Sequence, residues 1–326
     1  MPFPLNLAVR PFRTAPRPPP RRWSFHPQTT RAADLGSVVR KKVTIQALQA
    51  LRASNTPITV LTAYDYPTAL ACSSCPLIDI ILVGDSLAQV CLGYASTTQL
   101  SLDEMVHHAR AVKRGSSHPF VVADMPFGTY HASPHAAVEN AIRLVREAQV
   151  DAVKMEGGQE IVPLVARLTS VGIPVMAHVG LLPQRAVLFS GYRVQGRTAE
   201  SARSIVRDAL TLQDAGAFAV VVEAVPKELG RYITDKLSVP TIGIGAGPWT
   251  SGQVLVLDDA LGAWGGHKPK FARRFADLKS LRDGGVHRYA EAVRSGNFPD
   301  VQTESYSIDE GEWAKFVKME EGGSSE

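Results

Sequence analysis

The chain has 326 residues, of which 45% are hydrophobic and 20% charged, which is enough for one large domain or two ordinary ones. No run approaches the roughly 18 consecutive apolar residues that a membrane span needs, so we expect a soluble protein with no membrane partner. The net charge of +4 comes from the first 42 residues, and the remainder of the chain is acidic, which argues against a nucleic-acid partner.

The first 42 residues hold nine basic residues against the single acid Asp34, and they are broken by prolines that forbid a long helix. An Arg-rich, acid-poor leader without a central apolar run is typical of a mitochondrial transit peptide rather than of a secretory signal. We therefore predict a transit peptide over residues 1–40 and a location in the mitochondrial matrix. The alternative is a disordered basic arm that binds RNA or anionic lipid.

From residue 57 the chain carries eight short apolar runs. They are continuous rather than alternating, as in parallel strands that are covered on both faces. The runs are "PITVLTAYD" (57–65), "IDIILVGDS" (78–86), "PFVVADMPF" (119–127), "DAVKMEGG" (151–158), "IPVMAHVG" (173–180), "FAVVVEAV" (218–225), "VPTIGIGAG" (239–247) and, more weakly, "QVLVLDDALG" (253–262).

Helical patterns separate these runs. In "SLDEMVHHARAVKRG", Ser101 and Glu104 have the spacing of a capping box, and apolar residues fall on one helical face. Further helices are predicted from Ser133, over 160–171, over 198–215 and over 226–237. Alternating strands and helices over roughly 250 residues predict an α/β fold, a (β/α)8 TIM barrel; the alternative is a doubly wound open sheet.

Polar side chains gather where the apolar runs end, and in a barrel these ends meet at one rim. Side-chain alternation places Asp85 on the face of Val83, and likewise Glu223 on the face of Val221. Charges at the ends of apolar strands are costly unless they are paired or bind a metal, so their clustering predicts a site. The residues concerned are Asp65, Asp85, Ser86, Asp124, Lys154, Glu156, His178 and Glu223.

Carboxylates on neighbouring strands are the hard oxygen ligands that Mg²⁺ prefers. Such an ion would chelate and polarise a substrate with adjacent carboxylate and carbonyl oxygens. Lys154 would then hold the anionic end of the substrate, and Glu223 would remove a proton from the carbon beside the carbonyl. These roles indicate enolate chemistry. The spacing is equally compatible with an ion-pair network that closes the top of the barrel.

Two other motifs do not predict a ligand site. The "CSSC" of Cys72 and Cys75 lacks the second ligand pair of a zinc site, so these residues and Cys91 are expected to be reduced structural thiols. "GIGAG" (243–247) is not a dinucleotide fingerprint, and its glycines suit a tight turn at a strand end.

Several segments, in order, carry a resemblance to a known family: "TAYDY", "LVGDSLAQVCLGYASTTQLSLDEMVHHARAV", "ADMPFGTY", "VKMEGG", "PVMAHVGLLPQ", "GYRVQGR", "IGIGAG" and "GGHKPKF". Over residues 41–300 the chain resembles the ketopantoate hydroxymethyltransferases. The resemblance implies a (β/α)8 barrel and a homo-oligomer, a decamer in bacterial relatives. The implied reaction transfers a hydroxymethyl group from 5,10-methylenetetrahydrofolate to 3-methyl-2-oxobutanoate, giving 2-dehydropantoate for pantothenate synthesis.

By matching motif, Asp85 and Asp124 resemble the family's magnesium ligands, and Glu156 its third metal-site carboxylate. Ser86, Lys154 and His178 resemble residues that contact the bound keto acid. Asp85 and Asp124 are also expected to belong to the substrate-binding site. Glu223 resembles the general base. "GGHKPKF" (265–271) is then either a basic loop over the folate tail or a barrel-closing segment.

Two other functions stay open from the residues alone: another Mg²⁺-dependent enolate enzyme on the same barrel, such as a C–C lyase of 2-oxo acids, and a catalytically silent barrel. The predicted domains are the transit peptide at 1–40, the catalytic barrel at 41–300 and a solvated acidic tail at 301–326.

Overall fold

The computed structural model describes residues 40–188, 190–266 and 268–322. The chain divides into one unit that ends at Arg40 and a second that runs from Lys41 to Glu326. The predicted transit peptide, apart from Arg40, lies outside the described residues, and the description below concerns the second unit.

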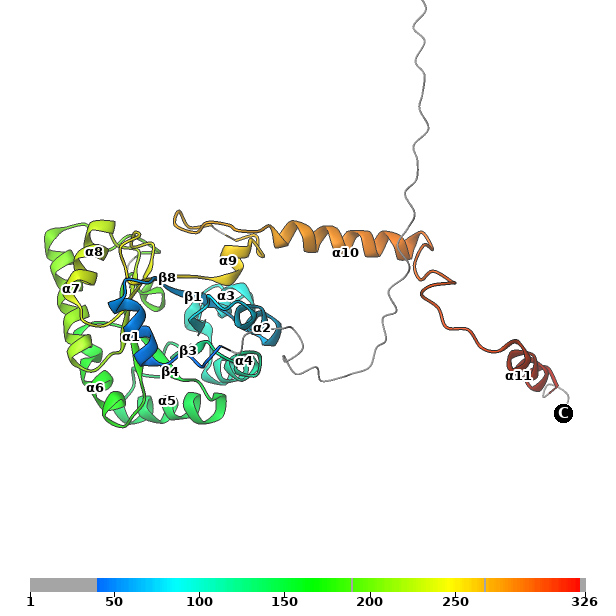
Figure 1. The fold of residues 1–326 in the computed structure, drawn as a ribbon, viewed down its shortest axis with the longest axis horizontal. Helices are drawn as coiled ribbons and strands as arrows, with labels where there is room; N and C mark the ends of the chain where they lie inside the picture. Colours follow the sequence, from blue (N-terminus) through cyan, green and yellow to red (C-terminus); the bar gives the residue numbers. More distant parts are fainter. Residues whose placement is uncertain (1–39, 189, 267, 323–326) are drawn as a thin grey trace, which may run out of the picture. The chain divides into compact units, whose positions relative to one another are not determined.

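Eight parallel strands close into a barrel in sequence order (Figure 1). Closure is made by β1 and β8, where Val60 lies opposite Val254, so the predicted barrel is confirmed and the open sheet is excluded. The strands are β1 (Ile58–Thr62), β2 (Ile80–Val83), β3 (Phe120–Asp124), β4 (Ala152–Glu156), β5 (Val175–Gly180), β6 (Ala219–Glu223), β7 (Thr241–Ile244) and β8 (Gly252–Leu255).

In the central strands, alternate side chains enter two separate apolar layers. Leu82 and Val122 belong to a small core inside the barrel, whereas Val83 and Val121 belong to the larger layer between strands and helices. This double burial explains why the runs read as continuous rather than alternating hydrophobic sequence.

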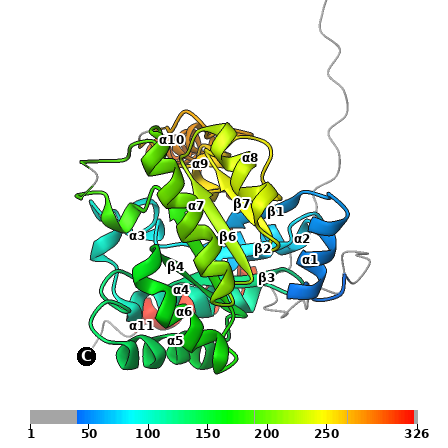
Figure 2. The same ribbon diagram turned by 90° about the vertical axis from the view of Figure 1, so that its left-hand side faces the viewer.

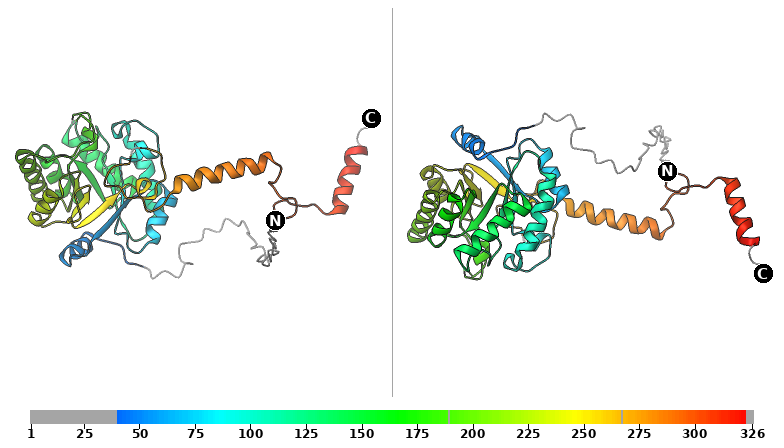
Figure 3. Two further views of the ribbon diagram at one scale, coloured as in Figure 1. Left: turned by 90° about the horizontal axis from the view of Figure 1, so that it is seen from above. Right: turned by 90° about the horizontal axis from the view of Figure 1, so that it is seen from below.

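Helices cover the outside of the strands (Figures 1 and 2). The views from above and below show the same arrangement (Figure 3). The predicted capping box of Ser101 and Glu104 opens α4, and Asp65 caps α2 together with Thr68. The helices are α1 (Ile45–Ala53), α2 (Tyr66–Ser74), α3 (Leu87–Val90), α4 (Leu102–Gly115), α5 (Pro134–Ala148), α6 (Val162–Ser170), α7 (Ala199–Asp214), α8 (Lys227–Lys236), α9 (Leu257–Leu261), α10 (Leu278–Arg294) and α11 (Glu310–Gly322), with short 3-10 turns at Thr97–Gln99, Gln159–Ile161 and Pro183–Arg185.

Helix α1 closes the end of the barrel where the strands begin. Its Leu48 is fully buried in the inner core, and the amide of Val43 donates to the carbonyl of His118 just before β3. Beneath it, the rings of Phe120 and Phe218 pack edge to face with centroids 5.5 Å apart. Helix α1 and these two rings fill this end of the barrel in the described part of the chain, which leaves the ends where the strands finish for a ligand.

The last part of the chain differs from the sequence expectation in detail. The run 253–262 is not one strand, because β8 ends at Leu255 and α9 takes up the remainder. The segment 301–326, expected to be a solvated tail, contains α11, and neither α10 nor α11 buries a residue. Among the described residues no helix is both long and apolar enough to cross a bilayer.

Candidate active site

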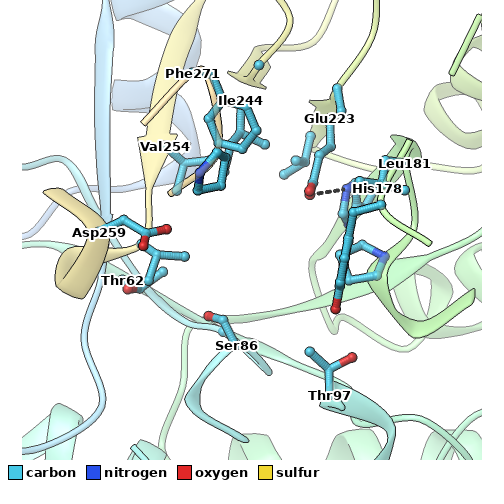
Figure 4. A pocket seen from close by; sticks show the side chains of 18 of the residues that line it. Thr62, Ser86, Thr97, His178, Leu181, Glu223, Ile244, Val254, Asp259 and Phe271 are labelled. Atoms are coloured by element: carbon cyan, nitrogen blue, oxygen red, sulfur yellow. Dashed lines mark ion pairs between the residues drawn. The ribbon is translucent and has the colours of Figure 1, made fainter. Parts of the chain in front are cut away.

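A cavity of about 660 Å³ opens at the ends of the strands (Figure 4). Seven of the eight residues predicted from the strand ends line it: Asp85, Ser86, Asp124, Lys154, Glu156, His178 and Glu223. The eighth, Asp65, caps α2 and is not among the residues that line the cavity. They come from β2 through β6 and the turns that follow, which is where a barrel concentrates its chemistry.

The centre of the cluster is a buried ion pair between adjacent strands. Asp124, the last residue of β3, lies opposite Lys154 of β4, and the Nζ atom of Lys154 is 2.8 Å from Oδ1 of Asp124. Burial alone would lower the pKa of Lys154, but the carboxylates of Asp124, Glu156 and Asp85 outweigh it and raise that pKa. Lys154 therefore carries a permanent positive charge under the cavity.

Asp85 enters the site by a different route from the one predicted. Strand β2 ends at Val83, whose side chain faces the helices, so strand alternation does not aim Asp85 inward. Instead the chain turns at Gly84, and the amide of Asp85 donates to Oδ2 of Asp124 at 2.9 Å. Burial, and then the charges of Asp124 and Glu156, raise the pKa of Asp85 to about 8.

His178 links two carboxylates on its flanking strands. It lies opposite Glu156 in the barrel, with Nδ1 at 3.5 Å from Oε1 of Glu156, and its Nε2 is 3.1 Å from Oε2 of Glu223. Burial and the charge of Lys154 lower the pKa of His178, but the two glutamates outweigh them and raise it to about 9. The two glutamates thus favour the protonated form of His178, which lies between Glu156 and the predicted base.

Gln184 is a site residue that the sequence reasoning missed. Its side chain donates to Oδ2 of Asp85 at 2.9 Å and to the carbonyl of Met125 at 3.0 Å, and it accepts from the hydroxyl of Tyr130 at 2.7 Å. Its backbone amide donates to Oε2 of Glu156 at 3.0 Å. One buried residue therefore fixes two of the three predicted metal carboxylates. The "GLLPQ" segment follows β5 directly, which was the available signal.

Ser86 is oriented by a chain of hydroxyl groups that the sequence did not reveal. The amide of Leu257 donates to Oγ1 of Thr62, and the hydroxyl of Thr62 donates to the phenol oxygen of Tyr64 at 2.7 Å. That phenol lies 2.7 Å from Oγ of Ser86, and either hydroxyl group can be the donor of this hydrogen bond. The contact fixes the position of Ser86 at the cavity.

The model of the family described as ketopantoate hydroxymethyltransferase matches residues 42–301, most of the chain. The chain belongs to the ketopantoate hydroxymethyltransferase family. The 3-methyl-2-oxobutanoate hydroxymethyltransferase of Moorella thermoacetica is 49% identical over 263 residues, covering 81% of this chain and 97% of the relative. The enzyme of the same name from Emericella nidulans is 46% identical over 281 residues, covering 86% of this chain and 80% of the relative.

Among solved structures, a phosphonopyruvate hydrolase in complex with oxalate and Mg²⁺ aligns with a TM-score of 0.54 and 15% identity, covering 86% of this chain and 97% of that one. A phosphoenolpyruvate phosphomutase from Streptomyces platensis subsp. rosaceus aligns with a TM-score of 0.52 and 14% identity, covering 85% of this chain and 95% of that one. At this identity the likeness concerns the fold alone, and it agrees with the closed barrel.

The charges of this ketopantoate hydroxymethyltransferase site are not balanced by its own side chains. With Asp85 ionised, four carboxylates, from Asp85, Asp124, Glu156 and Glu223, would face only Lys154 and protonated His178, an excess of two negative charges in a largely buried place. The raised pKa of Asp85 reflects this crowding of carboxylates. In the described part of the chain, no three acidic, histidine or cysteine side chains already form a metal cage. The excess charge and the raised pKa of Asp85 nonetheless fit a divalent cation, which would reverse that shift.

We expect Gln184→Ala to lower the affinity for Mg²⁺ by about 10- to 100-fold, because residues that orient metal ligands typically contribute this much. The substitution would leave Oδ2 of Asp85 without its amide donor. Calorimetric titration with Mg²⁺ measures the effect. Gln159→Ala, at an exposed position outside the cavity, is the matched control and should bind like the unaltered protein. An unchanged affinity in Gln184→Ala would contradict the positioning role.

Proposed function

We propose that this chain transfers a hydroxymethyl group from 5,10-methylenetetrahydrofolate to 3-methyl-2-oxobutanoate, giving 2-dehydropantoate and tetrahydrofolate in pantothenate synthesis. Membership of the family supports the reaction, and one observation of the site carries the mechanism. The buried cluster of carboxylates around Lys154 lies directly beside Glu223 at the mouth of the barrel. Such a place can hold an anionic keto acid and take a proton from it.

Asp85, Asp124 and Glu156 would hold Mg²⁺, because they are hard oxygen donors around which negative charge is in excess. When bound, the ion supplies a Lewis acid that polarises the carbonyl of the keto acid and is worth several kcal/mol at a developing negative charge. Gln184 orients the carboxylates of Asp85 and Glu156 for metal binding through its hydrogen bonds to both.

The remaining residues act on the keto acid itself. Lys154 offers a fixed positive charge to the substrate carboxylate, and Ser86, held in place by Tyr64, offers its hydroxyl group as a hydrogen-bonding partner. His178 holds the Glu223 carboxylate at the edge of the cavity, 3.1 Å from its Nε2. Glu223 can then remove the proton from C3 of the keto acid, next to the polarised carbonyl.

The overall step balances with one water. Glu223 takes the C3 proton, and the resulting enolate carbon forms a bond to the one-carbon unit of the donor. Both bonds from that carbon to folate nitrogens break, and the oxygen of water becomes the new hydroxyl group. The protons of water restore the two N–H groups of tetrahydrofolate, and the C3 proton ends on the product hydroxyl. No oxidant or reductant is needed.

A direct assay for 2-dehydropantoate tests the proposal. Purified protein should form product only when keto acid, methylenetetrahydrofolate and Mg²⁺ are all present, and chelation of the cation should stop it. If product forms equally without the folate, the one-carbon donor is wrong and a different enolate enzyme is indicated. A titration in which no divalent cation binds would remove the metal from the mechanism.

We further propose that residues 1–40 direct the protein to the mitochondrial matrix, on the strength of their Arg-rich, acid-poor composition. Deletion of this leader should abolish import, and import without it would contradict the proposal. A homo-oligomer is supported by the apolar side chains that α10 leaves exposed, including Leu281, Val286 and Tyr289. Sedimentation analysis that gives the mass of a single chain would contradict it.

A further inference from the structure

The cavity has two chemically different halves. One half is the polar cluster around Lys154, and the other is an apolar wall from β7, β8 and the segment that follows α9 (Figure 4). The wall is formed by Ile244, Val254, Val256, Trp264 and Phe271, with the backbone of Gly245 and Gly247 between them. We refer to these residues as the β7–β8 wall.

The whole cavity is larger than the keto acid requires. Its volume of about 660 Å³ lies in the range of pockets that enclose a drug-sized ligand. A five-carbon keto acid held by Lys154 and Ser86 would occupy only the polar half. The β7–β8 wall would then border space that the keto acid leaves unfilled.

The wall lies next to the base. Ile244 is the register partner of Glu223 across β6 and β7, and the amide of Ala224 donates to the carbonyl of Ile244 at 2.8 Å. A molecule lying on the wall would therefore reach the carbon from which Glu223 removes a proton. This is the position that a one-carbon donor must occupy.

Gly245 allows Phe271 to lie close to the backbone of the wall. Its φ of +65° is a conformation that favours glycine, and a Cβ atom there would come within 2.7 Å of Cδ1 of Phe271. Phe271 lines the cavity and is 37% exposed, so part of its side chain is accessible to a ligand. A flat aromatic surface of this kind suits stacking with a heterocycle.

Basic residues border the cavity as well. Lys270 precedes Phe271, and Arg193 comes from the loop after β5; both are exposed and line the cavity. Asp259, an acid that also lines this part of the cavity, accepts a hydrogen bond from Nε1 of Trp264 at 2.8 Å. The wall thus combines an aromatic surface with cations that could meet a carboxylate tail.

We infer that the β7–β8 wall is the binding subsite of the one-carbon donor, with the reduced pterin and aryl groups against Phe271 and the glutamate tail beside Lys270 and Arg193. The inference rests on the proposed function. It assigns the segment "GGHKPKF" to donor binding through its last two residues, rather than to barrel closure alone.

The test separates donor binding from keto-acid chemistry. Phe271→Ala should raise the KM for methylenetetrahydrofolate roughly 10-fold, because stacking of a flat base on an aromatic side chain is worth that much. Exchange of the C3 proton of the keto acid in D₂O, without any folate, should stay within about twofold, as should the KM for the keto acid. The intact exchange also shows that the variant is folded.

Lys270→Ala should raise the KM more for a polyglutamylated donor than for the monoglutamate, and added salt should remove the difference. The matched controls are Phe275→Ala and Lys268→Ala, exposed residues of the same segment that do not line the cavity, and both should behave like the unaltered enzyme.

Two results would overturn the inference in distinguishable ways. If the unaltered enzyme exchanges the C3 proton and forms product but Phe271→Ala keeps its donor KM, the subsite alone is wrong. If the unaltered enzyme neither exchanges the proton nor forms product, the proposed function fails and the subsite fails with it. A loss of exchange in Phe271→Ala as large as its loss of donor binding would also count against a donor-specific role.

Discussion

Glu223→Gln is expected to slow both exchange of the C3 proton and formation of product by about 10² to 10⁴, the usual contribution of a general base. The glutamine amide keeps the size of the side chain and can still lie beside Nε2 of His178, which is 3.1 Å away in the native site. It cannot accept the proton. Deuterium incorporation at C3, followed by NMR, measures the step without dependence on the folate.

The matched control for this variant is Glu228→Gln, the same chemical change on an exposed turn of α8. It should leave exchange and product formation unaltered. If Glu223→Gln loses less than about tenfold in exchange, then another group takes the proton and the assignment of the base is wrong.

Asp85→Asn is expected to lower turnover by about three orders of magnitude, because it removes a charged ligand from a Lewis-acid site worth several kcal/mol. The fold should survive. The amide oxygen can still accept from Gln184, and the raised pKa of Asp85 already favours a neutral side chain there when no cation is bound. Calorimetric titration with Mg²⁺ should show the affinity lost, while thermal unfolding without metal should be unchanged.

Asp103→Asn is a suitable control for this second variant, since Asp103 is 82% exposed on α4, contacts Arg143 and does not line the cavity. It should bind Mg²⁺ normally. Retention of normal Mg²⁺ affinity by Asp85→Asn would show that this carboxylate is not a ligand, and the ion-pair network proposed from the sequence as the alternative would then describe the cluster better.

The sequence was sufficient for the barrel because the strands from β2 to β6 are buried on both faces and end at, or just before, a polar or glycine residue. Runs such as 119–127 therefore predicted buried strands. The polar residues at the strand ends lie close together as predicted, with Asp124 opposite Lys154. Strand alternation also placed Val122 and Val221 in the inner core, below Asp124 and Glu223.

Strand alternation gave a wrong prediction for residues that lie beyond the end of a strand. Asp85 was assigned to the face of Val83, but Val83 packs outward and Asp85 reaches the site only because the chain turns at Gly84. Gln184 and Tyr64 were missed for the same reason. Their contacts with Asp85 and Ser86 join segments that are far apart in sequence, and no periodic pattern records such contacts.

One measurement tests the central claim most directly. Enzyme with Mg²⁺, unlabelled 3-methyl-2-oxobutanoate and donor carrying ¹³C at the methylene carbon should give a product whose label lies entirely in a new hydroxymethyl group on C3. Consumption of the keto acid without incorporation of that carbon would contradict the proposed transfer and would instead indicate cleavage or another reaction of the enolate.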